Sequence, residues 1–129
     1  MAQHISAFAL VVPDYDAAIA FYVGTLGFDL IEDTQQSETK RWVLIAPNGA
    51  ETRILLAKAD GDTQTAAIGN QTGGRVGFFL NTDDFEADYQ RMRTAGVHFE
   101  EEPRQEPYGT VAVFNDPFGN RWDLLQLAS

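Results

Sequence analysis

One pattern of apolar and polar residues occurs twice along the chain. A short apolar run at residues 8–12 is followed by Asp14 and by a stretch of helical periodicity that ends near Gly27. A similar run at residues 76–80 precedes a second helical stretch that ends near Gly96. Aspartate is a common N-cap residue, and glycine commonly follows the last residue of a helix. Each copy therefore predicts a strand followed by a helix.

The second helical stretch also predicts which of its faces is buried. Phe85, Tyr89 and Met92 recur at the spacing of one helix face. We expect this stripe to pack against a sheet, because apolar residues at that spacing lie above one another. Asp83 and Asp84 precede the stretch and are its N-cap candidates.

Three strand-like segments follow each helix, separated by turn residues such as proline, asparagine and glycine. The expected strands lie at about residues 28–33, 41–46, 52–58, 97–101, 110–115 and 121–127. This order predicts an α+β fold of tandem βαβββ modules, at about 1–60 and about 75–129, within a single domain of residues 1–129. A polar, glycine-rich connector at about 60–74 joins them, and we expect a short helical turn in it at 64–68.

Each predicted sheet has a helix on one face only, so two open faces remain. We expect these faces to form a curled mixed sheet around a cup-shaped cavity. Such a cavity is a candidate ligand site, because ligands bind in concave places. Strand alternation then sorts the side chains by face. If Asp123 points into the cup, Trp122 and Leu124 lie beneath the helix, and by the same alternation Arg53 shares its face with Leu55.

The composition excludes several classes of function. A net charge of -10 with only nine Lys and Arg residues argues against binding to DNA or RNA. The chain contains no cysteine, which excludes disulfides and zinc–thiolate sites. No apolar run approaches the roughly 20 residues that span a bilayer, and the first residues lack the pattern of a signal peptide. We therefore expect a cytoplasmic protein that binds neither nucleic acid nor a membrane.

Two distant segments carry a resemblance to a known family. Residues 13–28 join Pro-Asp, the first helical stretch and Leu-Gly-Phe, and residues 116–123 read Asp-Pro-Phe-Gly-Asn-Arg-Trp-Asp. Together they resemble the start and the end of a vicinal oxygen chelate domain, the superfamily of glyoxalase I, extradiol dioxygenases and bleomycin-resistance proteins. The resemblance covers nearly the whole chain. It implies the paired-module fold, and it implies a homodimer, because relatives commonly combine modules of two chains.

The resemblance also implies where a divalent metal would bind in the enzymes of this superfamily. The four ligand positions fall at Ala7, Leu55, Arg75 and Asp123. Methyl, isobutyl and guanidinium groups have no lone pair for a cation, so only the aspartate is a possible ligand. Neither histidine of the chain has a carboxylate at ligand spacing. We therefore expect no metal and no other cofactor.

Residues at the former ligand positions suggest what replaces the metal. Because these positions converge on one cation in the metal-binding relatives, Arg75 and Asp123 are expected to form an ion pair on the floor of the cup. Such a pair has two possible roles. It either holds the two strands in register or binds a carboxylate or carbonyl group of a ligand.

Further candidates lie in two other segments. Glu106 and Tyr108 precede the seventh strand in a loop that resembles the one overhanging the cup in relatives, where they are candidates for a general base and a hydrogen-bond donor. A solvated turn is the alternative. Arg41 and Trp42 are placed near the cup mouth to meet a planar or anionic ligand, unless they belong to an ordinary edge strand with the tryptophan in the core. Arg53 is a further candidate on the cup side.

Three functions remain open at this point. The first is a metal-independent binder of a small organic molecule, of the glyoxalase and bleomycin-resistance type. The second is a glyoxalase-like lyase or isomerase, either with a metal held by unrecognised ligands or metal-free with Glu106 as base and Arg75 stabilising an enolate oxygen. The third is a subunit without a ligand, whose cup is filled by side chains.

Overall fold

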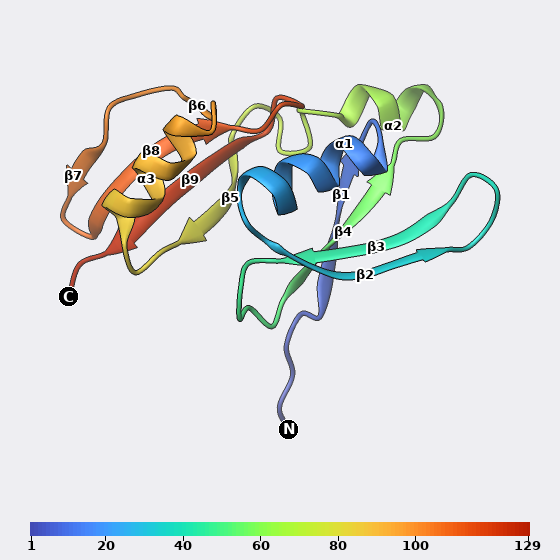
Figure 1. The fold of residues 1–129 in the computed structure, drawn as a ribbon, viewed down its shortest axis with the longest axis horizontal. Helices are drawn as coiled ribbons and strands as arrows, with labels where there is room; N and C mark the ends of the chain where they lie inside the picture. Colours follow the sequence, from blue (N-terminus) through green and yellow to red (C-terminus); the bar gives the residue numbers. More distant parts are fainter. The chain divides into compact units, whose positions relative to one another are not determined.

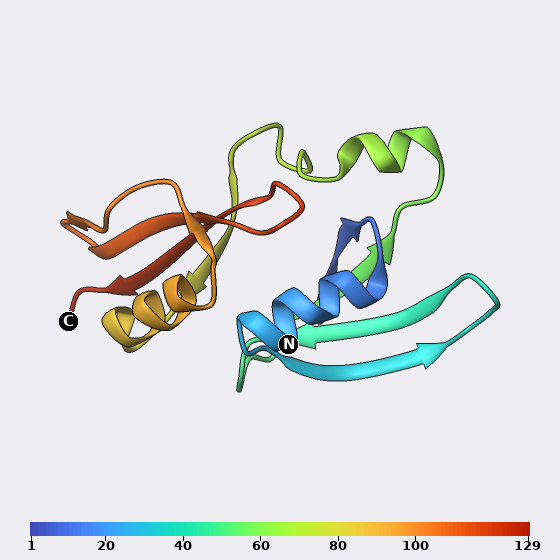
Figure 2. The same ribbon diagram turned by 45° about the horizontal axis from the view of Figure 1, so that its top comes forward.

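The computed structural model describes residues 1–129 and divides into two compact units, Met1–Ile68 and Gly69–Ser129 (Figure 1). Each unit contains one mixed sheet with a helix on one of its faces (Figure 2). The predicted α+β class and the repeated βαβββ-like order are confirmed. None of the helices is both long and apolar enough to cross a bilayer.

The first unit has a four-stranded sheet in the order β1-β4-β3-β2, with β1 parallel to β4 and the other pairs antiparallel. Its elements are β1 (Ala7–Val12), α1 (Tyr15–Ile19), η1 (Ala20–Thr25), β2 (Asp29–Gln35), β3 (Arg41–Ala46), β4 (Arg53–Lys58) and α2 (Gly61–Ala67). η1 continues α1 as a π-helix. The predicted helical turn of the connector is present as α2 and begins three residues earlier than expected, at Gly61.

Local signals set the ends of the first long helix. The side chain of Asp14 accepts a hydrogen bond from the Ala17 N–H at 2.8 Å, which satisfies one of the free N–H groups of the first turn. Gly27 follows the helix with a φ of 85°, a conformation that glycine adopts without strain. Beneath this helix the sheet side chains are fully buried, Leu10, Ile45 and Leu56 among them. The predicted helix limits are therefore confirmed.

The second unit has β9 and β8 at the centre of its sheet, in the order β5-β9-β8-β6, and β7 also pairs with β8. Its elements are β5 (Val76–Asn81), α3 (Phe85–Thr94), β6 (His98–Phe99), β7 (Arg104–Glu106), β8 (Gly109–Asn115) and β9 (Arg121–Leu127). The prediction of three strands after the helix missed β7. This strand forms a two-residue hairpin with β8, in which Glu106 lies opposite Gly109.

The core of the second unit confirms the predicted helix face and strand alternation. Phe85, Tyr89 and Met92 of α3 are buried. Trp122 and Leu124 of β9 are also buried, and the indole stacks between two phenylalanine rings. Aromatic pairs of this kind add to the stability that burial alone gives.

A buried carboxylate organises the turn before β9. Asp116 accepts hydrogen bonds from the Phe118 N–H at 3.0 Å and from the indole of Trp122 at 3.1 Å. It accepts two more from Asn120, through the backbone N–H and the side-chain amide. A buried charge needs such partners, so the Asp-Pro-Phe-Gly-Asn motif is a structural turn.

Candidate ligand-binding site

The open face of the first sheet has small and apolar side chains on β1, β4 and β3, and the polar Thr34 and Glu32 on β2, opposite Trp42 and Leu44. Strand pairing places Ala9 beside Leu55 and Leu55 beside Leu44, in one row across three strands. Trp42 lies two residues before Leu44, so its indole is on the same face, and 36% of its surface is exposed. Exposed indole beside apolar side chains is a surface on which a planar ligand can stack.

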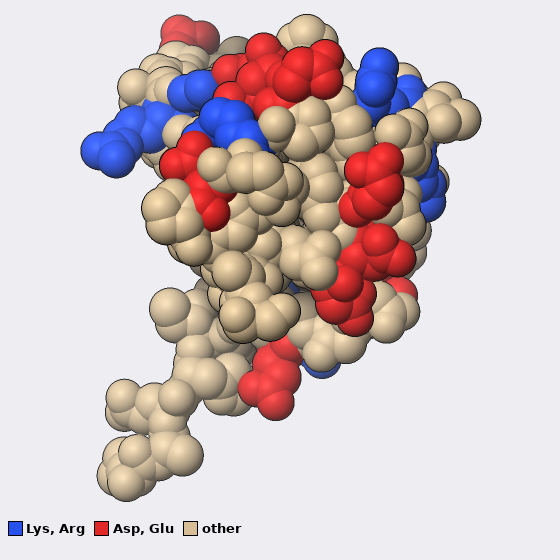
Figure 3. Space-filling view, turned by 90° about the vertical axis from the view of Figure 1, so that its left-hand side faces the viewer, with Lys and Arg blue, Asp and Glu red and all other residues tan.

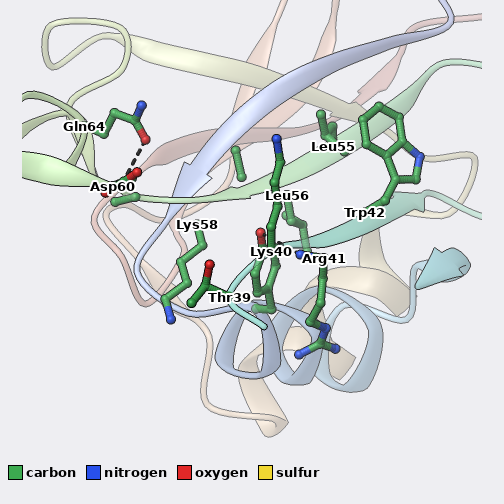
Figure 4. A pocket seen from close by; sticks show the side chains of 12 residues that line it. Thr39, Lys40, Arg41, Trp42, Leu55, Leu56, Lys58, Asp60 and Gln64 are labelled. Carbon is green, nitrogen blue, oxygen red and sulfur yellow. Dashed lines mark hydrogen bonds between the residues drawn. The ribbon is translucent and has the colours of Figure 1, made fainter. Parts of the chain in front are cut away.

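Two hollows meet at Trp42. The first has a volume of about 580 Å³ and is shown in Figure 4. It is lined by Tyr15, Thr39, Lys40, Arg41, Trp42, Leu55, Leu56, Ala57, Lys58, Ala59, Asp60 and Gln64. The second, of about 590 Å³, is lined by His4, Ser6, Ala7, Trp42, Leu44, Glu51 and Arg53. Both volumes fall within the range of sites for small organic ligands, about 300–1,000 Å³.

Arg41 lies on the opposite side of β3 from Trp42, with its guanidinium directed toward the helix (Figure 4). It forms ion pairs with Asp33 at 2.7 Å and with Asp16 at 2.9 Å, and it lies over the ring of Tyr15. The hydrogen bond from Arg41 lowers the pKa of Asp33. Neighbouring strand residues face opposite ways, so only Trp42 of this predicted pair reaches the open face.

The alternative for this segment, an edge strand with the tryptophan in the core, is wrong. β3 lies between β4 and β2, so it is an inner strand of the sheet. Trp42 is exposed because it is on the face without a helix. Arg53, the first residue of β4, shares that face with Leu55 as predicted and lines the second hollow.

The expected ion pair between Arg75 and Asp123 is absent from the structure. Arg75 lies just before β5, and the register puts Phe79 beside Asp123, roughly 10 Å or more further along the strand. A bulge at Gly77 also interrupts the alternation of side chains between Arg75 and Phe79. The prediction of this pair was wrong because the register of β5 against β9 was not visible in the sequence.

Charged side chains on the second sheet pair with one another. Arg104 binds Glu101 at 2.7 Å and Glu106 at 3.1 Å, and Arg121 binds Glu100 at 2.8 Å. Figure 3 shows basic side chains directly beside acidic ones on one face of the molecule. Loss of hydration raises the pKa of Asp123, which is partly buried among these groups.

The two remaining sequence candidates lie at the β7–β8 hairpin. Glu106 is the last residue of β7 and is held by Arg104. Tyr108 is in the turn, with 48% of its surface exposed, and its backbone oxygen accepts a hydrogen bond from the Ala128 N–H. The structure thus brings Glu106 and Tyr108 together in the second unit, while Arg41, Trp42 and Arg53 belong to the first.

The side chains do not fit a resident divalent metal. No group of three or more His, Asp or Glu residues is arranged to hold one. Of the four positions that the family resemblance assigns to metal ligands, only Asp123 has a side chain with a lone pair for a cation.

Lys40 is a lining residue that was not among the sequence candidates of this segment, Arg41 and Trp42. It lines the first hollow, two residues before Trp42. That two-residue spacing was the available signal, since it puts both side chains on the same side of a strand.

Comparisons with known proteins agree with this architecture. The model of the Glyoxalase/Bleomycin resistance protein/Dioxygenase superfamily matches residues 4–124. An uncharacterized protein of Shewanella frigidimarina (strain NCIMB 400) is 57% identical over 129 residues, covering 98% of this chain and 96% of the relative.

Two solved structures resemble the chain over nearly its whole length. UcmS2 has a TM-score of 0.83 at 34% identity, covering 97% of this chain and 98% of its own. TnmS3, an antibiotic binding protein from Streptomyces sp. CB03234, has a TM-score of 0.79 at 35% identity, covering 98% of each chain. The family match and these likenesses lead to one conclusion: the chain belongs to the glyoxalase, bleomycin resistance protein and dioxygenase superfamily.

Proposed function

We propose that the protein binds a small organic molecule without a metal, and that the open face of the first sheet is a wall of the ligand cavity. The observation that carries this proposal is the exposed indole of Trp42, which lies where the two hollows meet. Leu44 and Leu55 extend the apolar surface beside it. A planar ligand stacked on the indole would cover this surface and gain dispersion and hydrophobic energy.

The likeness to TnmS3 supports a small-molecule ligand. That protein is an antibiotic binding protein, and it shares 35% of its residues with this chain over 98% of both lengths. We carry over the class of function, binding of an organic compound, and not the compound itself. A homodimer, as in other members of the superfamily, is part of the proposal.

The absence of metal-ligating chemistry favours binding over metal-assisted catalysis. Glu106, the candidate base of a metal-free enzyme, forms an ion pair with Arg104. No observation therefore favours the lyase or isomerase alternative over the binder.

Fluorescence titration with the neutral aromatic probe N-phenyl-1-naphthylamine tests the proposal. We expect the wild-type protein to bind it, and Trp42→Ala to weaken binding about tenfold, because an aromatic contact contributes about 1 kcal/mol beyond buried area. Circular dichroism verifies that the variant is folded.

Phe8→Ala is the matched control for this titration. Phe8 is exposed to a similar degree, 41%, but it shares the helix-covered face of the same sheet with Leu10. Its removal should leave probe affinity unchanged. Equal affinity of the Trp42 variant and the wild type, or equal losses in both variants, would show that the open face is not the site.

A further inference from the structure

We propose that Lys40 forms an anion subsite beside Trp42, so that the ligand of this cavity is an aromatic compound with a negatively charged group such as a carboxylate or sulfonate. The proposal rests on the proposed function and specifies its ligand. The indole would hold the aromatic part, and the ammonium group would bind the charged part.

The charge around the first hollow, the one lined by Lys40, differs from that of the whole chain. The chain has 19 acidic and nine basic residues. The lining of this hollow reverses that ratio, with Lys40, Arg41 and Lys58 against one carboxylate, Asp60. Lys40 and Lys58 are the only two lysines of the protein. Because Arg41 is neutralised by two aspartates, the lysines supply the available positive charge.

Of the two lysines, Lys40 is the one on the side of the indole. Figure 4 shows its side chain extending on the same side of β3 as Trp42 and Leu55, and the side chain of Lys58 extending the opposite way. The strand pattern agrees, since Lys58 lies opposite Val12, which is buried beneath the helix. Asp60 is at the other end of the hollow from Trp42 in the same view.

The ammonium group of Lys40 is free to bind a ligand. It takes part in no ion pair, whereas Arg41, the next residue, has two. Lys40 is exposed, so its attraction for an anion is modest and falls as salt is added.

The backbone at Lys40 is held in place by the turn between β2 and β3. Its carbonyl accepts hydrogen bonds from the Gln36 N–H at 2.8 Å and the Ser37 N–H at 3.1 Å. Its own N–H donates to the Ser37 hydroxyl at 3.1 Å. The turn therefore fixes where the side chain starts, which reduces the entropy lost when a ligand binds.

Because the net charge of the protein is -10, an anion can be held at this subsite only by short-range contact with a cation. The protein as a whole repels an anion at long range, so an anion binds only where a local cation outweighs that repulsion. Removal of that single cation should then affect anionic ligands and spare neutral ones.

A pair of probes that differ in one charged group tests the inference. 8-Anilinonaphthalene-1-sulfonate is N-phenyl-1-naphthylamine with an added sulfonate, and both become fluorescent in apolar sites. We expect Lys40→Gln to lower the affinity for the sulfonate probe about fivefold, the effect of losing a partly exposed ion pair. The affinity for the neutral probe should not change. Added salt should weaken the sulfonate probe in the wild type and have little effect in the variant.

Two further variants complete the design. Lys58→Gln removes the rival lysine, and Arg91→Gln removes a cation of α3 in the second unit that pairs with Asp88. Both change the net charge by the same amount as Lys40→Gln. Neither should weaken the sulfonate probe as Lys40→Gln does.

Each remaining outcome contradicts a specific statement. Equal losses in the Lys40 and Lys58 variants, or in the Lys40 and Arg91 variants, would show general attraction to positive charge and overturn the subsite. Unchanged sulfonate affinity in Lys40→Gln, with Trp42-dependent binding of the neutral probe, would overturn the subsite and leave the proposed function standing. Failure of the wild type to bind the neutral probe would overturn both.

Discussion

The two sheets share one topology and differ in their open faces. The first presents an exposed tryptophan with Leu44 and Leu55 on one side and Thr34 opposite, and Lys40 lies free at its edge. On the second sheet, Arg104 and Arg121 are paired with neighbouring glutamates. The same strand–helix order thus supports one surface that lacks internal partners and another whose charges satisfy one another.

This difference indicates how a repeated module acquires a function. Burial beneath the helix constrains one face of each sheet to apolar residues, because a polar group there would lose its hydrogen bonds to water. The open face has no such constraint, so its side chains are free to serve a ligand or one another. Four predictions test this comparison.

The two tryptophans should differ most in their effect on stability. Trp122→Ala removes a buried ring that stacks on Phe78 and Phe114, and we expect the free energy of unfolding to fall by about 3–5 kcal/mol. Trp42→Ala should lower it by less than about 1 kcal/mol, because the side chain is partly exposed. Urea denaturation measures both. Similar losses would mean that Trp42 belongs to a core and not to an open surface.

Two glycines, Gly109 at the start of β8 and Gly49 in the turn after β3, should differ in how far alanine lowers stability. An alanine Cβ at Gly109 would meet the backbone oxygen of Gln126, whereas one at Gly49 would meet no atom nearby. Both residues have positive φ, so each alanine variant carries about 1–2 kcal/mol of backbone strain. Gly109→Ala should lower the free energy of unfolding by about 2–5 kcal/mol in total, because the hairpin must also move. Chemical denaturation of the two variants checks this, and equal losses would contradict the close packing at Gly109.

The N-cap residues of the two units should contribute about equally to stability. Asp14 accepts from the Ala17 N–H at 2.8 Å, and Asp84 accepts from the Ala87 N–H at 3.2 Å. We expect alanine at either position to lower the free energy of unfolding by about 1 kcal/mol. Thermal unfolding of both variants measures this. No loss at one of them would show that its helix does not depend on the cap.

Substitution of Asp123 should have the smallest effect on the free energy of unfolding, and this effect should depend on pH. Loss of hydration raises its pKa above the ordinary value of 3.8, so the unfolded chain ionises first as the pH rises. The contribution of Asp123 to stability therefore falls as the pH rises from 3.8 to the folded pKa, and the full loss remains at higher pH. We expect Asp123→Asn to raise the free energy of unfolding at pH 7 by less than about 1 kcal/mol, because the carboxyl group is only partly buried and solvent screens its charge.

The advantage of Asp123→Asn should shrink as the pH falls through the folded pKa, and it should vanish well below pH 3.8, where the carboxyl group is protonated in both states. Urea denaturation at a series of pH values follows this change. A gain that stays constant down to that pH would assign the effect to packing instead of charge.

Much of the fold was predictable from short stretches of sequence. Asp14 and Gly27 mark the limits of a helix because caps act within a few residues, and the spacing of Phe85, Tyr89 and Met92 identifies the buried face of another. The hairpin strand β7 was missed because Arg104–Glu106 is polar and too short to show alternation. Candidate residues in the site were less predictable, as the absent pair of Arg75 and Asp123 shows.

The sequence by itself determined the two strand–helix repeats, their caps and the alternation that separates Trp42 from Arg41. Only the tertiary structure decided which of these two faces the helix, and that Arg75 lies far along its strand from Asp123. The physical reason is range. Caps and periodicity depend on residues a few positions apart, whereas strand register depends on pairing between distant segments, and one bulged residue shifts it.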